Sequence, residues 1–126
     1  YYSGLGDGTI YEYDLGSGKS ESIYKSDNDK GYFYITFDGN YIWMDDEGYK
    51  SMAMYFNKQS SSLDYTIYQL GIDGKLIAKR TIPDEEKIFS IMHGDSRRMF
   101  MFSFVNNKIV YIDKSNIEKG DIKELR

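Results

Sequence analysis

Four residues at the end of one predicted strand have side chains that could bind a ligand: Trp43, Asp45, Asp46 and Glu47. Alternation along an extended strand places Trp43, Asp45 and Glu47 on one side and Asp46 on the other. Adjacent carboxylates beside an indole ring could bind a cation or the hydroxyl groups of a sugar. The same pattern also fits a polar loop beside a tryptophan of the core, and the sequence leaves both interpretations open.

The other residues whose side chains could take part in catalysis or metal binding do not form a recognisable site. The chain has no Cys and one His, which excludes a thiolate zinc site, a cysteine nucleophile and a multi-histidine metal centre. Gly16–Ser20 lacks the upstream glycine of a phosphate-binding loop and precedes a predicted strand. The acidic loop that starts at Asp27 has Asp38, not a glutamate, at the twelfth position of a calcium loop. We therefore assign no catalytic residue, no metal ligand and no cofactor.

Composition narrows the class of partner. The chain has 126 residues, of which 40% are hydrophobic and 29% charged, as expected for a globular domain. Its 16 basic and 20 acidic residues give a net charge of −4 without a basic stripe, so nucleic acid is not an expected partner. No apolar run approaches the roughly 20 residues of a membrane span. The lack of cysteine favours an extracytoplasmic location, secreted or on the cell surface.

The elements that must position these residues are predicted to be short strands. Runs rich in Tyr, Ile, Phe and Thr are separated by turns rich in Gly, Asp, Asn and Ser. Similar runs recur with a Gly–Lys or Lys–Gly turn after each, at Thr9–Tyr11, Thr66–Tyr68 and Ile109–Tyr111. Phe33–Phe37 and Phe89–His93 form a second recurring pair, 56 residues apart. Because the connections are short, the sequence predicts a repeated antiparallel meander of four strands.

The repeat divides the single segment 1–126 into three units. A partial unit at 1–26 has three predicted strands, whereas the units at 32–83 and 87–126 have four each. The middle unit carries an insertion of about 13 residues within 45–63, and its tip at 58–62 is polar. The Asp-Gly pair at Asp73–Gly74 predicts a tight primed hairpin turn.

Particular strings in these units resemble the repeats of bacterial β-propellers of the TolB-like, six-bladed type. Gly8–Leu15 with Gly18-Lys19, and Tyr65–Leu70 with Asp73-Gly74-Lys75, are similar to the outer hairpin of such blades, and Phe37–Trp43 is similar to their inner corner. The resemblance implies an all-β chain of about two and three-quarter propeller blades. A closed propeller needs at least four blades. A segment of a longer protein, a ring closed by several chains, an open stack, and a sandwich or barrel all remain possible architectures.

The expected function is a non-enzymatic binding or interaction scaffold, exported by a bacterium, with a protein or carbohydrate ligand. The insertion at 45–63 is the expected surface element because long loops on regular repeats commonly carry function. The alternative is a carbohydrate-active or hydrolytic propeller enzyme whose catalytic residues lie mostly outside this segment.

Overall fold

The computed structural model describes residues 1–3, 8–25, 34–45, 65–83, 89–91, 94–103 and 107–125. These residues form eleven strands in three antiparallel sheets, together with one short 3₁₀ turn and no α-helix. The all-β prediction is therefore confirmed. The insertion at 45–63 lies outside the described residues from Asp46 to its end.

Each sheet is a meander whose strands follow chain order. Sheet 1 contains β1 (Tyr2–Ser3), β2 (Thr9–Asp14) and β3 (Lys19–Lys25). Sheet 2 contains β4 (Tyr34–Phe37), β5 (Ile42–Asp45), β6 (Tyr65–Leu70) and β7 (Leu76–Ile82). Sheet 3 contains β8 (Phe89–Ile91), β9 (Arg98–Ser103), β10 (Lys108–Asp113) and β11 (Lys123–Glu124). The grouping into three, four and four strands agrees with the sequence prediction, and each sheet lies within one predicted unit.

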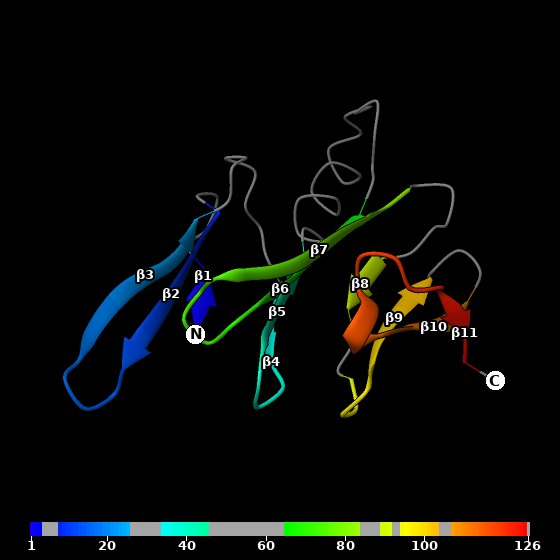
Figure 1. The fold of residues 1–126 in the computed structure, drawn as a ribbon. Helices are drawn as coiled ribbons and strands as arrows, with labels where there is room; N and C mark the ends of the chain where they lie inside the picture. Colours follow the sequence, from blue (N-terminus) through cyan, green and yellow to red (C-terminus); the bar gives the residue numbers. More distant parts are fainter. Residues whose placement is uncertain are drawn as a thin grey trace.

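The three sheets pack face to face in chain order, with sheet 2 between sheets 1 and 3 (Figure 1). Alternation along β5 directs Ile42 and Met44 toward sheet 1 and Trp43 toward sheet 3. One buried cluster fills the first interface: Ile10, Ile42, Met44, Tyr68 and Leu70. A second cluster fills the other interface: Trp43, Tyr65, Ile67, Ile82, Met99, Met101, Ile112 and Ile117. Both faces of sheet 2 are thus covered, and the alternate methionines of β9, Met99 and Met101, pack in the second cluster.

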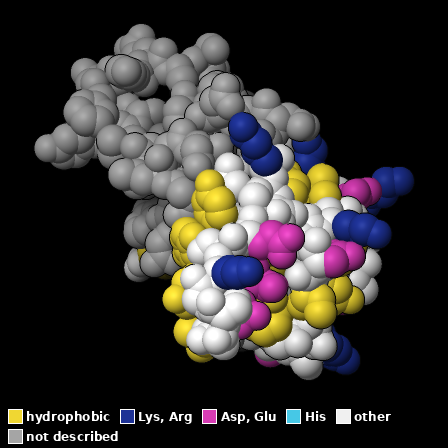
Figure 2. Space-filling view, turned by 90° about the vertical axis from the view of Figure 1, so that its left-hand side faces the viewer, with side chains coloured by type: hydrophobic (Ala, Val, Ile, Leu, Met, Phe, Trp, Pro, Cys, Tyr) yellow, Lys and Arg dark blue, Asp and Glu magenta, His cyan; other side chains and the backbone are white. Residues whose placement is uncertain are grey.

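The exposed side of sheet 1 corrects one expectation. The alternation of Tyr11, Tyr13 and Leu15, repeated at Tyr68, Leu70 and Ile72, predicts that these side chains fill strand faces. Tyr68 and Leu70 are buried as predicted, whereas Ile72 is exposed. Tyr13 and Leu15 instead lie near the β2–β3 turn and are 48% and 91% exposed. Seen from this side, separate hydrophobic patches lie between acidic and basic side chains (Figure 2). Tyr13 and Leu15 are exposed because this end of β2 extends beyond the buried cluster that contains Ile10.

Aspartate side chains shape the turns at one end of the stack, where the β2–β3, β4–β5 and β8–β9 turns all lie (Figure 1). In each, one carboxylate oxygen accepts the backbone N–H groups two and three residues further along. Asp14, Asp38 and Asp95 hold these positions. Asp38 and Asp95 are 57 residues apart and occupy equivalent turns of sheets 2 and 3.

The β6–β7 turn differs from the predicted tight hairpin. Gly74 has a positive φ of 82°, but Asp73 does not, so the turn is not of the primed type with two left-handed residues. The chain instead makes a wider loop, in which the Gly74 N–H donates to the carbonyl of Gly71 and the Gly71 N–H donates to that of Lys75. A Cβ at Gly74 would lie 1.9 Å from the carbonyl oxygen of Ile23, so sheet 1 packs directly on this turn. Glycine is required here by both φ and contact.

The C-terminal part of sheet 3 is less regular than predicted. After β10, Asp113 caps a 3₁₀ turn, η2 (Lys114–Asn116), by accepting the N–H of Ser115. The turn at Lys119-Gly120 predicts a strand over Asp121–Leu125, but the final strand, β11, contains only Lys123 and Glu124. The Arg80 guanidinium on β7 donates to the carbonyl oxygens of Ile117 and Gly120, which ties this segment to sheet 2.

Candidate functional site

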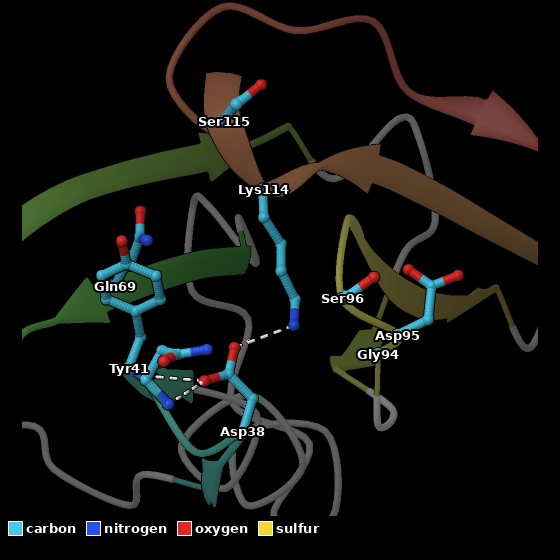
Figure 3. Close-up of a pocket in the computed structure, with 9 residues that line it drawn as sticks. Asp38, Tyr41, Gln69, Gly94, Asp95, Ser96, Lys114 and Ser115 are labelled. Atoms are coloured by element: carbon cyan, nitrogen blue, oxygen red, sulfur yellow. Dashed lines mark hydrogen bonds and ion pairs between the residues drawn. The ribbon is translucent and has the colours of Figure 1, made fainter.

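A pocket with a volume of about 460 Å³ lies between sheets 2 and 3, at the end where their turns meet (Figure 3). The β4–β5 turn, the end of β6, the β8–β9 turn and the start of η2 form its walls. Its lining residues are mostly polar: Asp38, Asn40, Tyr41, Gln69, Gly94, Asp95, Ser96, Lys114 and Ser115. The volume is within the range of small-molecule sites, roughly 300–1,000 Å³.

Asp38 stands at the centre of this pocket and is surrounded by hydrogen-bond donors. Its Oδ1 accepts the backbone N–H groups of Asn40 and Tyr41, at 2.9 and 2.8 Å. Its Oδ2 accepts the Trp43 Nε1–H and the Lys114 ammonium, both at 2.8 Å. Burial alone would raise the pKa of Asp38. The hydrogen bonds, that from Lys114 foremost, outweigh burial and hold this pKa well below its usual value.

Lys114 reaches Asp38 from the other sheet. The Lys114 and Asp38 side chains are only 9% and 10% exposed, and the Lys114 ammonium lies 5.6 Å from the centre of the Trp43 ring. The backbone N–H of Lys114 donates to the Arg97 carbonyl at 2.8 Å, which fixes the base of the side chain. A Cβ on Gly94 would lie 3.2 Å from Lys114 Cε, so the β8–β9 turn lies against the lysine. The ion pair therefore links sheet 2 to sheet 3 on the pocket wall.

Asp95 is the second carboxylate of the pocket and is satisfied within its own turn. Its Oδ1 accepts the backbone N–H groups of Arg97 and Arg98, and its Oδ2 accepts the Arg98 guanidinium at 2.6 and 2.8 Å. The hydrogen bond from the Arg98 side chain, with the two backbone donors, lowers the pKa of Asp95 to about 2. Both pocket carboxylates are thus ionised at neutral pH, and each already accepts four hydrogen bonds, close to a carboxylate's full capacity.

Gln69 has hydrogen-bonding capacity that the described residues do not use. It is 5% exposed, pairs with Trp43 across β5 and β6, and so lies on the face that meets sheet 3. No hydrogen bond joins its side-chain amide to another residue in the described part of the chain. Tyr41 lies at the rim, 37% exposed, with its ring edge-on to Trp43 at 6.3 Å and 77°.

The residues predicted as ligand-binding candidates divide into two groups. Trp43 and Asp45 are fully buried; Trp43 belongs to the core between sheets 2 and 3, and Asp45 accepts a hydrogen bond from the Tyr65 hydroxyl. The described structure thus gives the indole a packing role, with its N–H directed at Asp38. Asp46 and Glu47 lie outside the described residues, so ligand binding by these two acids stays a prediction.

Sequence reasoning did not identify Asp38, Gln69 or Lys114 as site residues. One signal was present, because the turn aspartates Asp38 and Asp95 recur at the spacing of the strand repeat. Lys114 and Gln69 carry no comparable signal, since each is a single polar residue at the end of a strand.

Comparisons of the chain with protein-family models, with curated proteins and with solved structures find no match. Within the described residues, no group of three or more His, Cys, Asp and Glu could hold a metal ion. No helix in that part of the chain has the length and apolar character to cross a membrane. The pocket itself is therefore the basis for an assignment of function.

Proposed function

We propose that this chain is part of a β-propeller-type scaffold that binds a ligand without chemical change. The proposal is supported by the arrangement of the sheets, since three consecutive antiparallel meanders stack face to face in chain order (Figure 1). Propeller blades are four-stranded antiparallel sheets that pack in this sequential manner. Ligands of such scaffolds commonly bind where the connecting loops gather at one end of the strands.

The observation that carries the proposal is the polar pocket between the turns of sheets 2 and 3. It combines a buried ion pair, which holds its wall in place (Figure 3), with the amide of Gln69, the hydroxyl of Ser96 and the ring of Tyr41 among its lining residues. These groups can form hydrogen bonds and aromatic contacts with a ligand without reacting with it. The pocket is therefore suited to recognition.

The alternative function, a propeller hydrolase, receives less support at this pocket. Glycoside hydrolysis needs one carboxylic acid with a raised pKa that can protonate the leaving group. Asp38 and Asp95 have lowered pKa values and accept hydrogen bonds at both oxygens. Neither is therefore a proton donor near neutral pH. An extracytoplasmic location and a bacterial origin remain part of the proposal on the sequence argument alone.

Screening of the ¹⁵N-labelled chain by NMR against a mixed library of sugars, small amides, carboxylates and peptides tests the proposed function. We expect saturable shifts of the backbone amides of Tyr41, Gly94, Ser96 and Lys114 with at least one library member. A panel of chromogenic glycosides and esters should remain unhydrolysed. Turnover of any of these substrates, or the absence of every shift at the pocket, would refute the proposal.

Deletion of the polar tip at 58–62 separates the pocket from the insertion as the site. Binding at the pocket should survive this deletion, because the described residues that form its walls come from other segments of the chain. Loss of binding in the deletion variant would instead place the site on the insertion.

A further inference from the structure

Gln69 is 5% exposed, and its side-chain amide makes no hydrogen bond to another described residue. It offers one acceptor and two donors, and buried polar groups in proteins nearly always have a hydrogen-bond partner. Its side chain lines the pocket, so water or a ligand in the cavity can supply that partner. The Lys114 ammonium has three N–H donors and uses one on Asp38, which leaves further donors at the same cavity. The pocket therefore presents both donors and acceptors to its contents.

The charges around the cavity favour an uncharged ligand. Each carboxylate of the lining has a cationic partner, Asp38 with Lys114 and Asp95 with Arg98, so the pocket presents no unpaired charge that would attract an anion. A cation would need carboxylate oxygens to bind it. Both carboxylates already accept protein donors at each oxygen, so a cation finds no vacant ligand there.

The aromatic ring of Tyr41 at the rim of the pocket narrows the chemical class of the ligand further. Tyr41 is partly exposed, and its edge-on contact with the buried Trp43 fixes the orientation of its ring. One face of a pyranose ring is a surface of C–H groups, which packs on an aromatic ring, while its hydroxyl groups both donate and accept. The hydroxyl of Ser96 and the amide of Gln69 suit those groups.

We propose that the pocket binds an uncharged pyranose unit, with Tyr41 as the stacking surface and Gln69 and Lys114 as hydrogen-bonding residues. This inference rests on the proposed binding function and specifies its ligand. The pocket volume of about 460 Å³ accommodates a monosaccharide with the first atoms of a neighbouring unit.

Titration of the ¹⁵N-labelled chain with single probes tests whether the ligand is an uncharged pyranose. The sugar probes are the methyl glycosides of glucose, galactose, mannose and N-acetylglucosamine; the non-sugar probes are N-acetylalanine methylamide and citrate. We expect at least one glycoside to shift the Gln69 side-chain NH₂ resonances and the Tyr41 backbone amide in a saturable manner. The two non-sugar probes should leave both unchanged.

Two variants and one matched control locate the binding residues. Gln69→Met keeps the length of the side chain and removes its hydrogen bonds, and it should weaken glycoside binding about tenfold. Tyr41→Ala should weaken it by a similar factor, and, because Tyr41 lies at the rim, this variant keeps the test valid should Gln69→Met not fold. Tyr13→Ala, which removes another exposed tyrosine on sheet 1, should bind as the parent does.

The possible failures are distinguishable. Shifts with the amide or with citrate alone would overturn the sugar assignment and leave the binding function in place. Glycoside binding that is unchanged in both Gln69→Met and Tyr41→Ala would place the sugar elsewhere and overturn the inference. No shift at the pocket with any probe here, or with any member of the wider library, would refute both the inference and the proposed function.

Discussion

Replacement of Lys114 by methionine should lower the free energy of unfolding by about 3 kcal/mol. The ion pair with Asp38 is nine-tenths buried at both side chains, and methionine retains most of the aliphatic length of lysine. Removing one partner from a buried ion pair typically costs about 3–5 kcal/mol, because the remaining charge loses its compensation. Asp38 keeps three N–H donors, from Asn40, Tyr41 and Trp43, which places the expected cost at the lower end.

Lys108→Met provides the matched control within the same sheet. Lys108 pairs with Glu124 at 3.3 Å, but these side chains are 49% and 41% exposed. Exposed pairs contribute at most about 1 kcal/mol. Urea denaturation, followed by circular dichroism and by the fluorescence of the single tryptophan, Trp43, measures both variants. With a slope of about 1–3 kcal/mol per M, the Lys114→Met midpoint should fall by roughly 1–3 M.

A double-mutant cycle with Asp38→Asn isolates the interaction. Each single variant leaves one buried group without its charged partner, whereas the double variant removes both charges. We expect the double variant to be less destabilised than the sum of the single variants by about 2 kcal/mol, as for directly contacting residues. An additive result would refute a direct ionic interaction between Asp38 and Lys114.

The pH dependence gives a second readout with a defined sign. The folded-state pKa of Asp38 is depressed below its unfolded value of about 3.9, so its ionised form stabilises the fold above about pH 4. This contribution is lost as the pH falls through the folded-state pKa. The stability difference between parent and Lys114→Met should therefore be largest near pH 7 and shrink only once the pH falls below the folded-state pKa of Asp38 in the variant. A difference that grows as the pH falls, or a cost no larger than that of Lys108→Met, would contradict the reasoning.

Three further perturbations test the same end of the stack. Gly94→Ala should destabilise the chain by about 1–3 kcal/mol in urea denaturation, because its Cβ would lie 2.2 Å from the Arg98 carbonyl oxygen; parent-like stability would contradict this close approach. Trp43→Phe should cost about 2 kcal/mol, since it removes buried volume and the N–H donor to Asp38, and a cost below about 0.5 kcal/mol would exclude a core role for the indole. Asp95, whose pKa is lowered to about 2, should stabilise the fold above about pH 4 and lose this effect toward pH 2. The stabilities of parent and Asp95→Asn should therefore converge over that interval, and a difference that does not change with pH would refute the assignment.

Local sequence signals were sufficient to predict the strands and their grouping. The recurring strings at Thr9–Tyr11, Thr66–Tyr68 and Ile109–Tyr111 all lie in strands that pair with the next strand along the chain. A short turn between two strand-forming runs makes the two strands antiparallel neighbours in one sheet. This pairing depends on few contacts between residues distant in sequence. The error at Asp73–Gly74 concerns the form of the turn. The loop there is wider than a two-residue hairpin, and Gly74 packs against Ile23 of another sheet, a contact that the dipeptide alone does not specify.

The pocket could not be predicted in the same way because it lies between sheets. Lys114 meets Asp38 across 76 residues of sequence, and nothing in the residues around either position specifies the other. Trp43 and Asp45 were predicted as ligand-binding residues because an indole and several carboxylates are adjacent in the sequence. In the structure both side chains belong to the interior, and the indole contributes its N–H to a site whose other members come from different elements.

Comparison of the two equivalent turns explains why the pocket forms at this position. Asp38 and Asp95 accept the same pair of backbone N–H groups, so the turn itself needs only one carboxylate oxygen. The second oxygen is what differs. At Asp95 it binds Arg98 of the same turn, whereas at Asp38 it binds Lys114 of the neighbouring sheet. The Asp95 turn can therefore form without help from another sheet, but the Asp38 turn completes its hydrogen bonds only when sheets 2 and 3 are stacked. Stacking of the sheets and organisation of the pocket are consequently coupled through a single carboxylate.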